Sequence, residues 1–272
     1  MTEARDARWV VVAVVVVAGA AWAWLALGPD RVPGLPGLPA SSPADAPEMA
    51  TALAARGGVR QSEWGATLGW LSGWVATVLA VMAVPALPLL LTFRRLACRR
   101  GHAAAPLVAC GAAFVGVWVS AGIILMVGGG LARGIVARSD WLTAHPQVLS
   151  GSAAILAGVY QFTALKRTCL AACQRPIRAA VTSWRGAVDT ATEAALVGAR
   201  FAAVCVGCSW ALMLVPFAVG ADVVLVTFVT GVAMSAECVF SRIRALVAAV
   251  AVLTVGVGFG LLAGVLPPGF TA

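Results

Sequence analysis

The feature that most constrains this chain is a series of apolar stretches, each long enough to cross a lipid bilayer. The hydrocarbon core of a bilayer is about 30 Å thick, which takes about 20 apolar residues in a helix. Only 11% of the residues are charged, against roughly 25% in an ordinary soluble domain. Because backbone hydrogen bonds inside a bilayer must be satisfied internally, we predict an all-α, polytopic transmembrane helical bundle. About seven spans are expected, near residues 9–27, 64–93, 106–130, 152–172, 201–219, 223–240 and 245–266.

The apolar stretches divide the chain into three parts. Residues 1–27 predict an N-terminal transmembrane helix preceded by Arg5 and Arg8. A cleaved signal peptide is the alternative, but the apolar stretch is long for one and no Ala-x-Ala site follows directly, so we favour a retained helix. Residues 28–63 are expected to form a Pro/Gly-rich outer loop with little apolar surface to bury. Residues 64–272 predict a six-helix membrane domain that carries the cysteine motifs.

The basic residues predict which side of the membrane each segment faces. Cytoplasmic segments carry an excess of Lys and Arg. With the N-terminus inside, fourteen of the nineteen Lys and Arg residues fall in inner segments and five in outer ones. We therefore expect a multi-pass protein of a cytoplasmic (inner) membrane with a cytoplasmic N-terminus. Its net charge of +8 fits inner loops beside anionic lipid, so the bilayer is the expected partner and nucleic acid is not.

All seven cysteines fall on the inner side in this topology. The cytosol keeps thiols reduced, so a disulfide framework is not expected. Reduced thiols grouped on several helices are instead candidate ligands for a soft metal ion. Cys98, Cys110 and Cys238 stand singly, and each is interpreted as a small core residue.

Two pairs of cysteines have the spacing of half-sites. Residues three or four apart share one face of a helix, so Cys169 with Cys173 and Cys205 with Cys208 each present two sulfurs on one side. Together the pairs can form a four-sulfur site for a zinc ion, or offer two or three thiolates to a copper ion. Cys205 and Cys208 should lie roughly 7–12 Å deeper than Arg200, whereas the first pair lies near the interface. Two readings therefore stay open: the pairs meet in one site, or they are successive stations.

These cysteines belong to two longer motifs, "GVYQFTALKRTCLAACQRP" at 158–176 and "CVGCSWALMLVPFAVG" at 205–220. They resemble the bacterial domain-of-unknown-function 2182 family of predicted metal-binding integral membrane proteins, some of which are linked to copper chaperones. The family reads Tyr-Gln-x-Thr-Pro-Leu-Lys-x-x-Cys-Leu-x-x-Cys in the first motif and Cys-x-Gly-Cys-Cys-Trp-Ala-Leu-Met in the second. The resemblance covers about residues 64–245 and implies a copper-handling membrane protein.

The chain is a divergent member by this comparison. Ala164 replaces the proline of the first motif, and Ser209 replaces the second adjacent cysteine of the other. Phe201 stands near the position of a family histidine, and Met82 is alone where the family has two adjacent methionines.

Five further residues are candidates for a supporting role at the metal site. Met82 and Met213 offer thioethers, although methionine also fills gaps between helices. Glu237 is an ionisable group near the inner end of a span, where it can act as an oxygen ligand or pair with Arg242. Trp210 and Tyr160 are expected beside the cysteines, as a dry wall and as an interhelical hydrogen-bonding group.

The sequence favours a membrane protein that binds a soft metal ion for handling, delivery or transport, without enzymatic activity. Copper is favoured over zinc, and a metal chaperone or a recipient metalloprotein is the expected partner, with a homo-oligomer also possible. A membrane thiol-disulfide oxidoreductase that uses Cys205 and Cys208 is the first alternative. A structural subunit whose cysteines merely pack is the second.

Overall fold

The protein is built from α-helices. The computed structural model describes residues 2–27, 59–98, 104–175, 190–219, 223–239 and 244–266, so the predicted outer loop at 28–63 lies almost wholly outside the described residues. The described ranges are nearly all helical, which confirms the all-α prediction. The helices are α1 (Thr2–Ala26), α3 (Val59–Cys98), α4 (Ala104–Val136), α5 (Asp140–Ala144), α6 (Pro146–Tyr160), α7 (Ala164–Cys173), α9 (Thr190–Ser209), α10 (Val215–Ala218), α11 (Val223–Val239) and α12 (Arg244–Leu262).

Five of the described helices, α1, α3, α4, α9 and α12, contain stretches long and apolar enough to cross a membrane. The bent pair of α6 and α7 makes a sixth if it counts as one span, and α11 is apolar but has only 17 residues. The structure therefore contains five to six candidate spans in place of about seven. The difference arises because the window at 152–172 bends between two helices and the window at 223–240 forms a helix of only 17 residues.

The window at 152–172 is broken by a sharp corner. Helix α6 ends at Tyr160, α7 begins at Ala164, and the two helices are bent by 65°. Thr163 starts the new helix, because its extended backbone ends the old direction and its hydroxyl oxygen accepts the Lys166 N–H at 3.2 Å. Such an N-cap satisfies one of the backbone N–H groups that a helix start leaves free.

The window at 201–219 is also interrupted. Helix α9 begins earlier than predicted, at Thr190, and ends at Ser209; a 3₁₀ turn (Leu212–Leu214) and the short helix α10 follow. Pro216 explains the break. It has no backbone N–H, and in a continuous helix its ring would clash with the carbonyl of Leu212.

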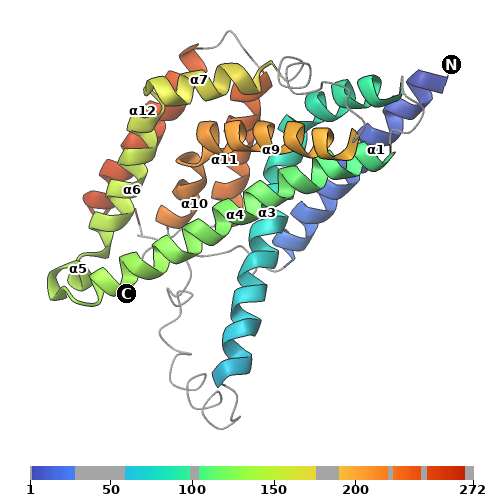
Figure 1. Ribbon diagram of the computed structural model, residues 1–272. Helices are drawn as coiled ribbons and strands as arrows, with labels where there is room; N and C mark the ends of the chain where they lie inside the picture. The colour runs from blue at the N-terminus through green and yellow to red at the C-terminus, as the bar shows by residue number, and fades with distance from the viewer. Residues whose placement is uncertain are drawn as a thin grey trace.

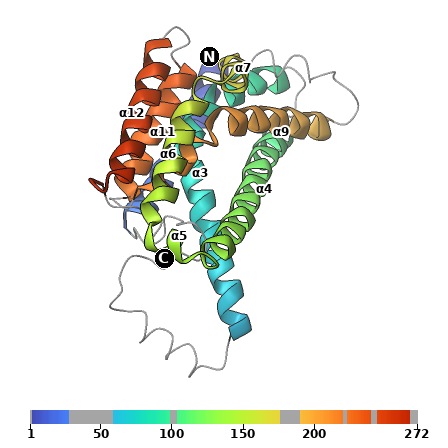
Figure 2. The same cartoon turned by 90° about the vertical axis from the view of Figure 1, so that its left-hand side faces the viewer.

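The most extensive helix contacts pair α4 with α9, α6 with α12 and α1 with α3. Glycine permits the closest of these approaches. A Cβ on Gly198 of α9 would overlap the backbone carbonyl of Cys110 in α4, and one on Gly158 of α6 would lie 2.9 Å from the carbonyl oxygen of Ala251 in α12. Figures 1 and 2 show α6 and α12 side by side, while α9 lies crosswise at a steep angle to both.

The two ends of the bundle differ in what they carry. In both views the start of α1 and the whole of α7 lie at one end, and α5 lies at the other (Figures 1 and 2). The crosswise course of α9 brings its C-terminal end, which carries Cys205 and Cys208, against α7. This arrangement places both cysteine motifs at the end of the bundle where α1 begins.

Candidate metal centre

Helix α7 presents one buried stripe toward α9. Lys166 and Cys173 are buried and Cys169 and Leu170 half-buried, at the i, i+3, i+4 and i+7 positions of one helix face. The opposite face is exposed and includes Arg167. The first motif therefore folds as an amphipathic helix that turns its cysteines toward the second motif.

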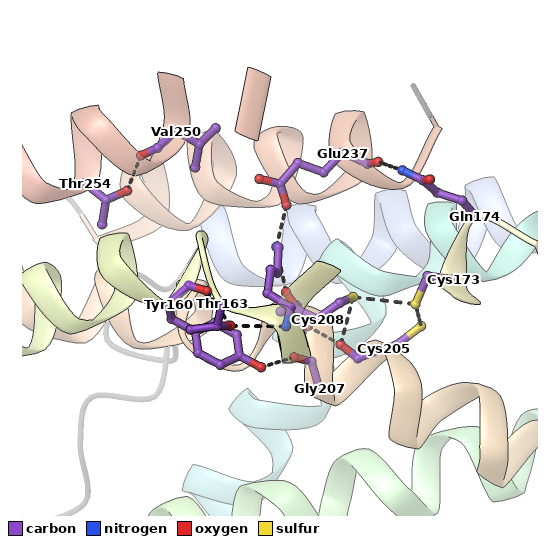
Figure 3. A network of polar contacts seen from close by, with 12 residues as sticks. Tyr160, Thr163, Cys173, Gln174, Cys205, Gly207, Cys208, Glu237, Val250 and Thr254 are labelled. Atoms are coloured by element: carbon purple, nitrogen blue, oxygen red, sulfur yellow. Dashed lines mark hydrogen bonds and ion pairs between the residues drawn. The ribbon is translucent and has the colours of Figure 1, made fainter. Parts of the chain in front are cut away.

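The two predicted cysteine pairs meet through Cys173. Its sulfur lies 3.3 Å from the sulfur of Cys205 and 3.5 Å from that of Cys208. Figure 3 shows Cys173 approaching the other two from its own helix. All three side chains are buried, with at most 6% of their surface exposed. The reading of two separated stations is thus not the arrangement that the structure has.

Cys169, the other member of the first pair, lies against the backbone of α9. A Cβ built on Gly207 would be 2.7 Å from the Cys169 sulfur. Glycine at this position is therefore what lets the thiol approach α9 between Cys205 and Cys208.

Cys238 joins the cluster from a third helix. On α11, it lines a small cavity together with Cys205 and Cys208 of α9 and Lys166 of α7. The sequence interpretation of Cys238 as an isolated core residue missed this proximity. No spacing rule would have found it, because the contact joins α11 to α7 and α9.

A small cavity adjoins the thiols. Its volume of about 10 Å³ is roughly that of one water-sized particle. Five sulfur-bearing residues contribute to its lining: Met82, Cys205, Cys208, Met234 and Cys238. Met234 was not among the predicted site residues. The cavity thus combines thiols with two thioethers, the donor types that suit Cu(I).

A buried ion pair borders the same cavity. The Lys166 Nζ lies 2.6 Å from Oε2 of Glu237, and both side chains are 1% exposed. Glu237 therefore pairs with Lys166; Arg242, its predicted partner, lies outside the described residues. Its second oxygen, Oε1, is buried and has no hydrogen-bond partner among the described residues. Gln174 of α7 also donates to the backbone carbonyl of Glu237 at 2.8 Å.

The predicted aromatic pair lies beside the end of α9. The Tyr160 hydroxyl donates to the carbonyl oxygen of Gly207. Its ring meets that of Trp210 edge to face, with centroids 5.0 Å apart. Trp210 follows α9 directly and is 37% exposed, so it covers the cysteine-bearing turn from outside.

The structure separates the two predicted methionines. Met82 of α3 lines the thiol cavity, whereas Met213 lines a different small cavity that also borders Trp74, Thr77 and Thr227. Of the two predicted methionines, only Met82 therefore lies in the cavity that the cysteines border.

The cysteine thiols have the donor chemistry that a soft metal ion requires. Among the residues that the structure describes, no group of three or more His, Cys, Asp and Glu side chains is already arranged to hold a metal ion. The sulfurs instead contact one another, and the Cys208 thiol also donates to the Cys205 carbonyl at 3.2 Å. Two thiolates bound to one ion at about 2.3 Å each stand roughly 3.7–4.0 Å apart. The observed sulfur separations are a few tenths of an ångström shorter, and the donor chemistry fits a soft ion.

Comparison with known proteins identifies a family. The family model of PpoB2, described as a copper chaperone, matches residues 71–261, more than two thirds of the chain. No curated protein and no solved structure matches. The family match confirms the relationship that the two cysteine motifs predicted. The chain belongs to the PpoB2 copper chaperone family.

Proposed function

We propose that this membrane protein binds Cu(I) as cargo at Cys173, Cys205 and Cys208 and hands it to a partner, without catalysing a reaction. The observation that carries the proposal is the meeting of these three thiols from α7 and α9 at 3.3–3.5 Å. Cys169 packs against Gly207 next to Cys208 in the chain, and Cys238 lines the cavity that Cys205 and Cys208 border. Membership of a copper chaperone family supports copper as the cargo.

The surroundings of the thiols support copper over zinc. Structural zinc sites are closed tetrahedra, almost always with four protein ligands. The cavity beside the thiols instead adds the thioethers of Met82 and Met234, and thioethers select for Cu(I). A site with more soft donors than the ion needs also suits transfer, because an incoming ligand can replace one sulfur at a time.

The proposal includes an orientation. The excess of basic residues in segments on the N-terminal side of the membrane favours a cytoplasmic N-terminus. Since α7 lies at the same end as the start of α1, the thiols then face the cytoplasm of a bacterial inner membrane. The recipient or donor is accordingly a cytoplasmic metal chaperone or a metalloprotein that docks at this end.

Metal analysis tests the proposal. The full-length protein, purified under reducing conditions and exposed to Cu(I), is expected to retain about one copper ion per chain. The Cys205→Ser, Cys208→Ser double variant should retain none. Cys110→Ser is the matched control, because that cysteine is buried on α4 and lines a different cavity, with residues of α1 and α3. Absence of copper from the unmodified protein would contradict the proposal.

One alternative keeps a specific observation in its favour. A 3.3 Å contact between the Cys173 and Cys205 sulfurs also places them for a disulfide, as a thiol oxidoreductase requires. Thiol counting after purification without reductant separates the two functions. A stable Cys173–Cys205 disulfide with no copper retained on reduction would favour the redox function.

A further inference from the structure

The C-terminal end of α9 depends on side chains from another helix pair. A helix leaves its last four carbonyl groups without partners in its own ladder. In α9 these belong to residues 206–209. The Val206 carbonyl accepts the N–H of Trp210 at 2.9 Å, so Gly207 and Cys208 are the next carbonyls that need donors.

Both donors come from the corner between α6 and α7. The Tyr160 hydroxyl, at the end of α6, donates to the Gly207 carbonyl. The Lys166 ammonium, one turn into α7, donates to the Cys208 carbonyl at 2.6 Å. The two motifs that sequence analysis singled out therefore bind one another through backbone carbonyls as well as through sulfur.

Lys166 is the more constrained of the two donors. It is 1% exposed and contacts the Cys208 carbonyl and the Glu237 carboxylate at once. A cation at a helix C-terminus is stabilised by the helix dipole, and the carboxylate compensates the cost of burying it. One side chain on α7 thus links the end of α9 to α11.

We propose that Lys166 is a positioning residue of the metal centre. By holding the Cys208 carbonyl and Glu237 together, it fixes the end of α9 so that the thiols of Cys205 and Cys208 face Cys173. For its effect on copper this inference rests on the proposed function. The arrangement of the thiols can be measured separately, in the absence of metal.

The first measurement uses thiol cross-linking of the metal-free, full-length protein. The azo oxidant diamide takes one hydrogen from each of two thiols, so that a sulfur–sulfur bond forms and the azo group is reduced to a hydrazine. Mass spectrometry then gives the yield of peptides that link Cys173 to Cys205 or Cys208. The second measurement is Cu(I) affinity, by competition with a chromogenic Cu(I) chelator.

The variants separate positioning from folding. Lys166→Leu with Glu237→Leu removes both charges, keeps apolar side chains of similar size and adds no sulfur donor beside the cavity. Buried ion pairs often tolerate such a replacement without loss of stability. Lys166→Arg keeps a cation that can donate to both acceptors. Arg167→Leu is the matched control, since it removes a cation from the exposed face of the same helix. If the leucine pair does not fold, Lys166→Gln with Glu237→Gln replaces it, because both amides are uncharged and the glutamine at 166 is one bond shorter than lysine.

The inference predicts that the folded double variant loses cross-linking severalfold and Cu(I) affinity by roughly 10–100-fold, the range for partners that orient metal ligands. Lys166→Arg should keep both near the values of the unmodified protein, and Arg167→Leu should change neither. Cross-linking and affinity equal to the unmodified protein in a folded double variant would overturn the inference. If the double variant loses cross-linking and the unmodified protein does not bind Cu(I), the result would support positioning and reject the proposed function.

Discussion

Cys173 and Cys205 lie 32 positions apart in the chain, yet their sulfur atoms are 3.3 Å apart. The contact exists because α6 ends at Tyr160 and α7 turns by 65° across the end of the bundle. A straight continuation of α6 would carry Cys173 away from α9. The corner at residues 161–163 is therefore as important for the thiol cluster as the cysteines themselves.

Replacing the cysteines singly should rank their contributions. We expect Cys173→Ser to lower Cu(I) affinity by more than the roughly 10–100-fold typical of an outer partner of a metal ligand, because its sulfur contacts those of both Cys205 and Cys208. Cys169→Ser should have a smaller effect, since that sulfur packs against Gly207. Chelator competition on the purified variants measures both. An equal loss from both variants would mean that the ion lies between the pairs rather than at Cys173.

The buried ion pair gives a stability prediction. Lys166→Met alone leaves the Glu237 carboxylate buried without its partner, so we expect a loss of about 3–5 kcal/mol. Adding Glu237→Met should recover most of that loss, because no uncompensated charge remains. Reversible unfolding of the two variants in detergent provides the comparison. If the single and double variants were equally unstable, the contact would not behave as a coupled pair.

The helical architecture was largely predictable from the sequence. Long apolar stretches with few charges identified α1, α3, α4, α11 and α12 and the second half of α9, because a bilayer requires helices of a minimum length. The paired cysteines were predictable as well, since positions three and four apart share a helix face. Hydropathy alone predicts one span at 201–219, whereas the chain leaves the helical path after Ser209 and Pro216 lies in the first turn of the separate helix α10.

The contribution of a third helix, α11, to the site was not predictable from residue spacing. Cys238 and Glu237 come from α11, and Lys166 comes from α7, so their proximity depends on how separate helices pack. Met234 had no distinguishing sequence signal, because a methionine in an apolar helix usually fills space. Lys166 did carry such a signal, because a lysine within the predicted span at 152–172 needs a partner if it is buried.

The contact between α4 and α9 should tolerate no side chain at Gly198. A Cβ there would overlap the carbonyl group of Cys110, and relief requires the two helices to separate. We expect Gly198→Ala to destabilise the protein by about 1–3 kcal/mol, the usual cost of overpacking. Gly116→Ala in α4 is the control, because nothing lies within 4 Å of its Cβ position. Unfolding curves in detergent should shift for the first variant and stay in place for the second.

The proposed orientation predicts opposite labelling of two engineered cysteines. Arg167 is exposed on α7, and Asp140 is exposed on α5 at the other end of the bundle. If α7 faces the cytoplasm, a membrane-impermeant maleimide added to spheroplasts should label Asp140→Cys and should label Arg167→Cys only after permeabilisation. Labelling is counted as the increase over the parent chain, whose own thiols set the background. The reverse pattern would put the thiol cluster on the outer face, and the copper partner would then have to be sought outside the cytoplasm.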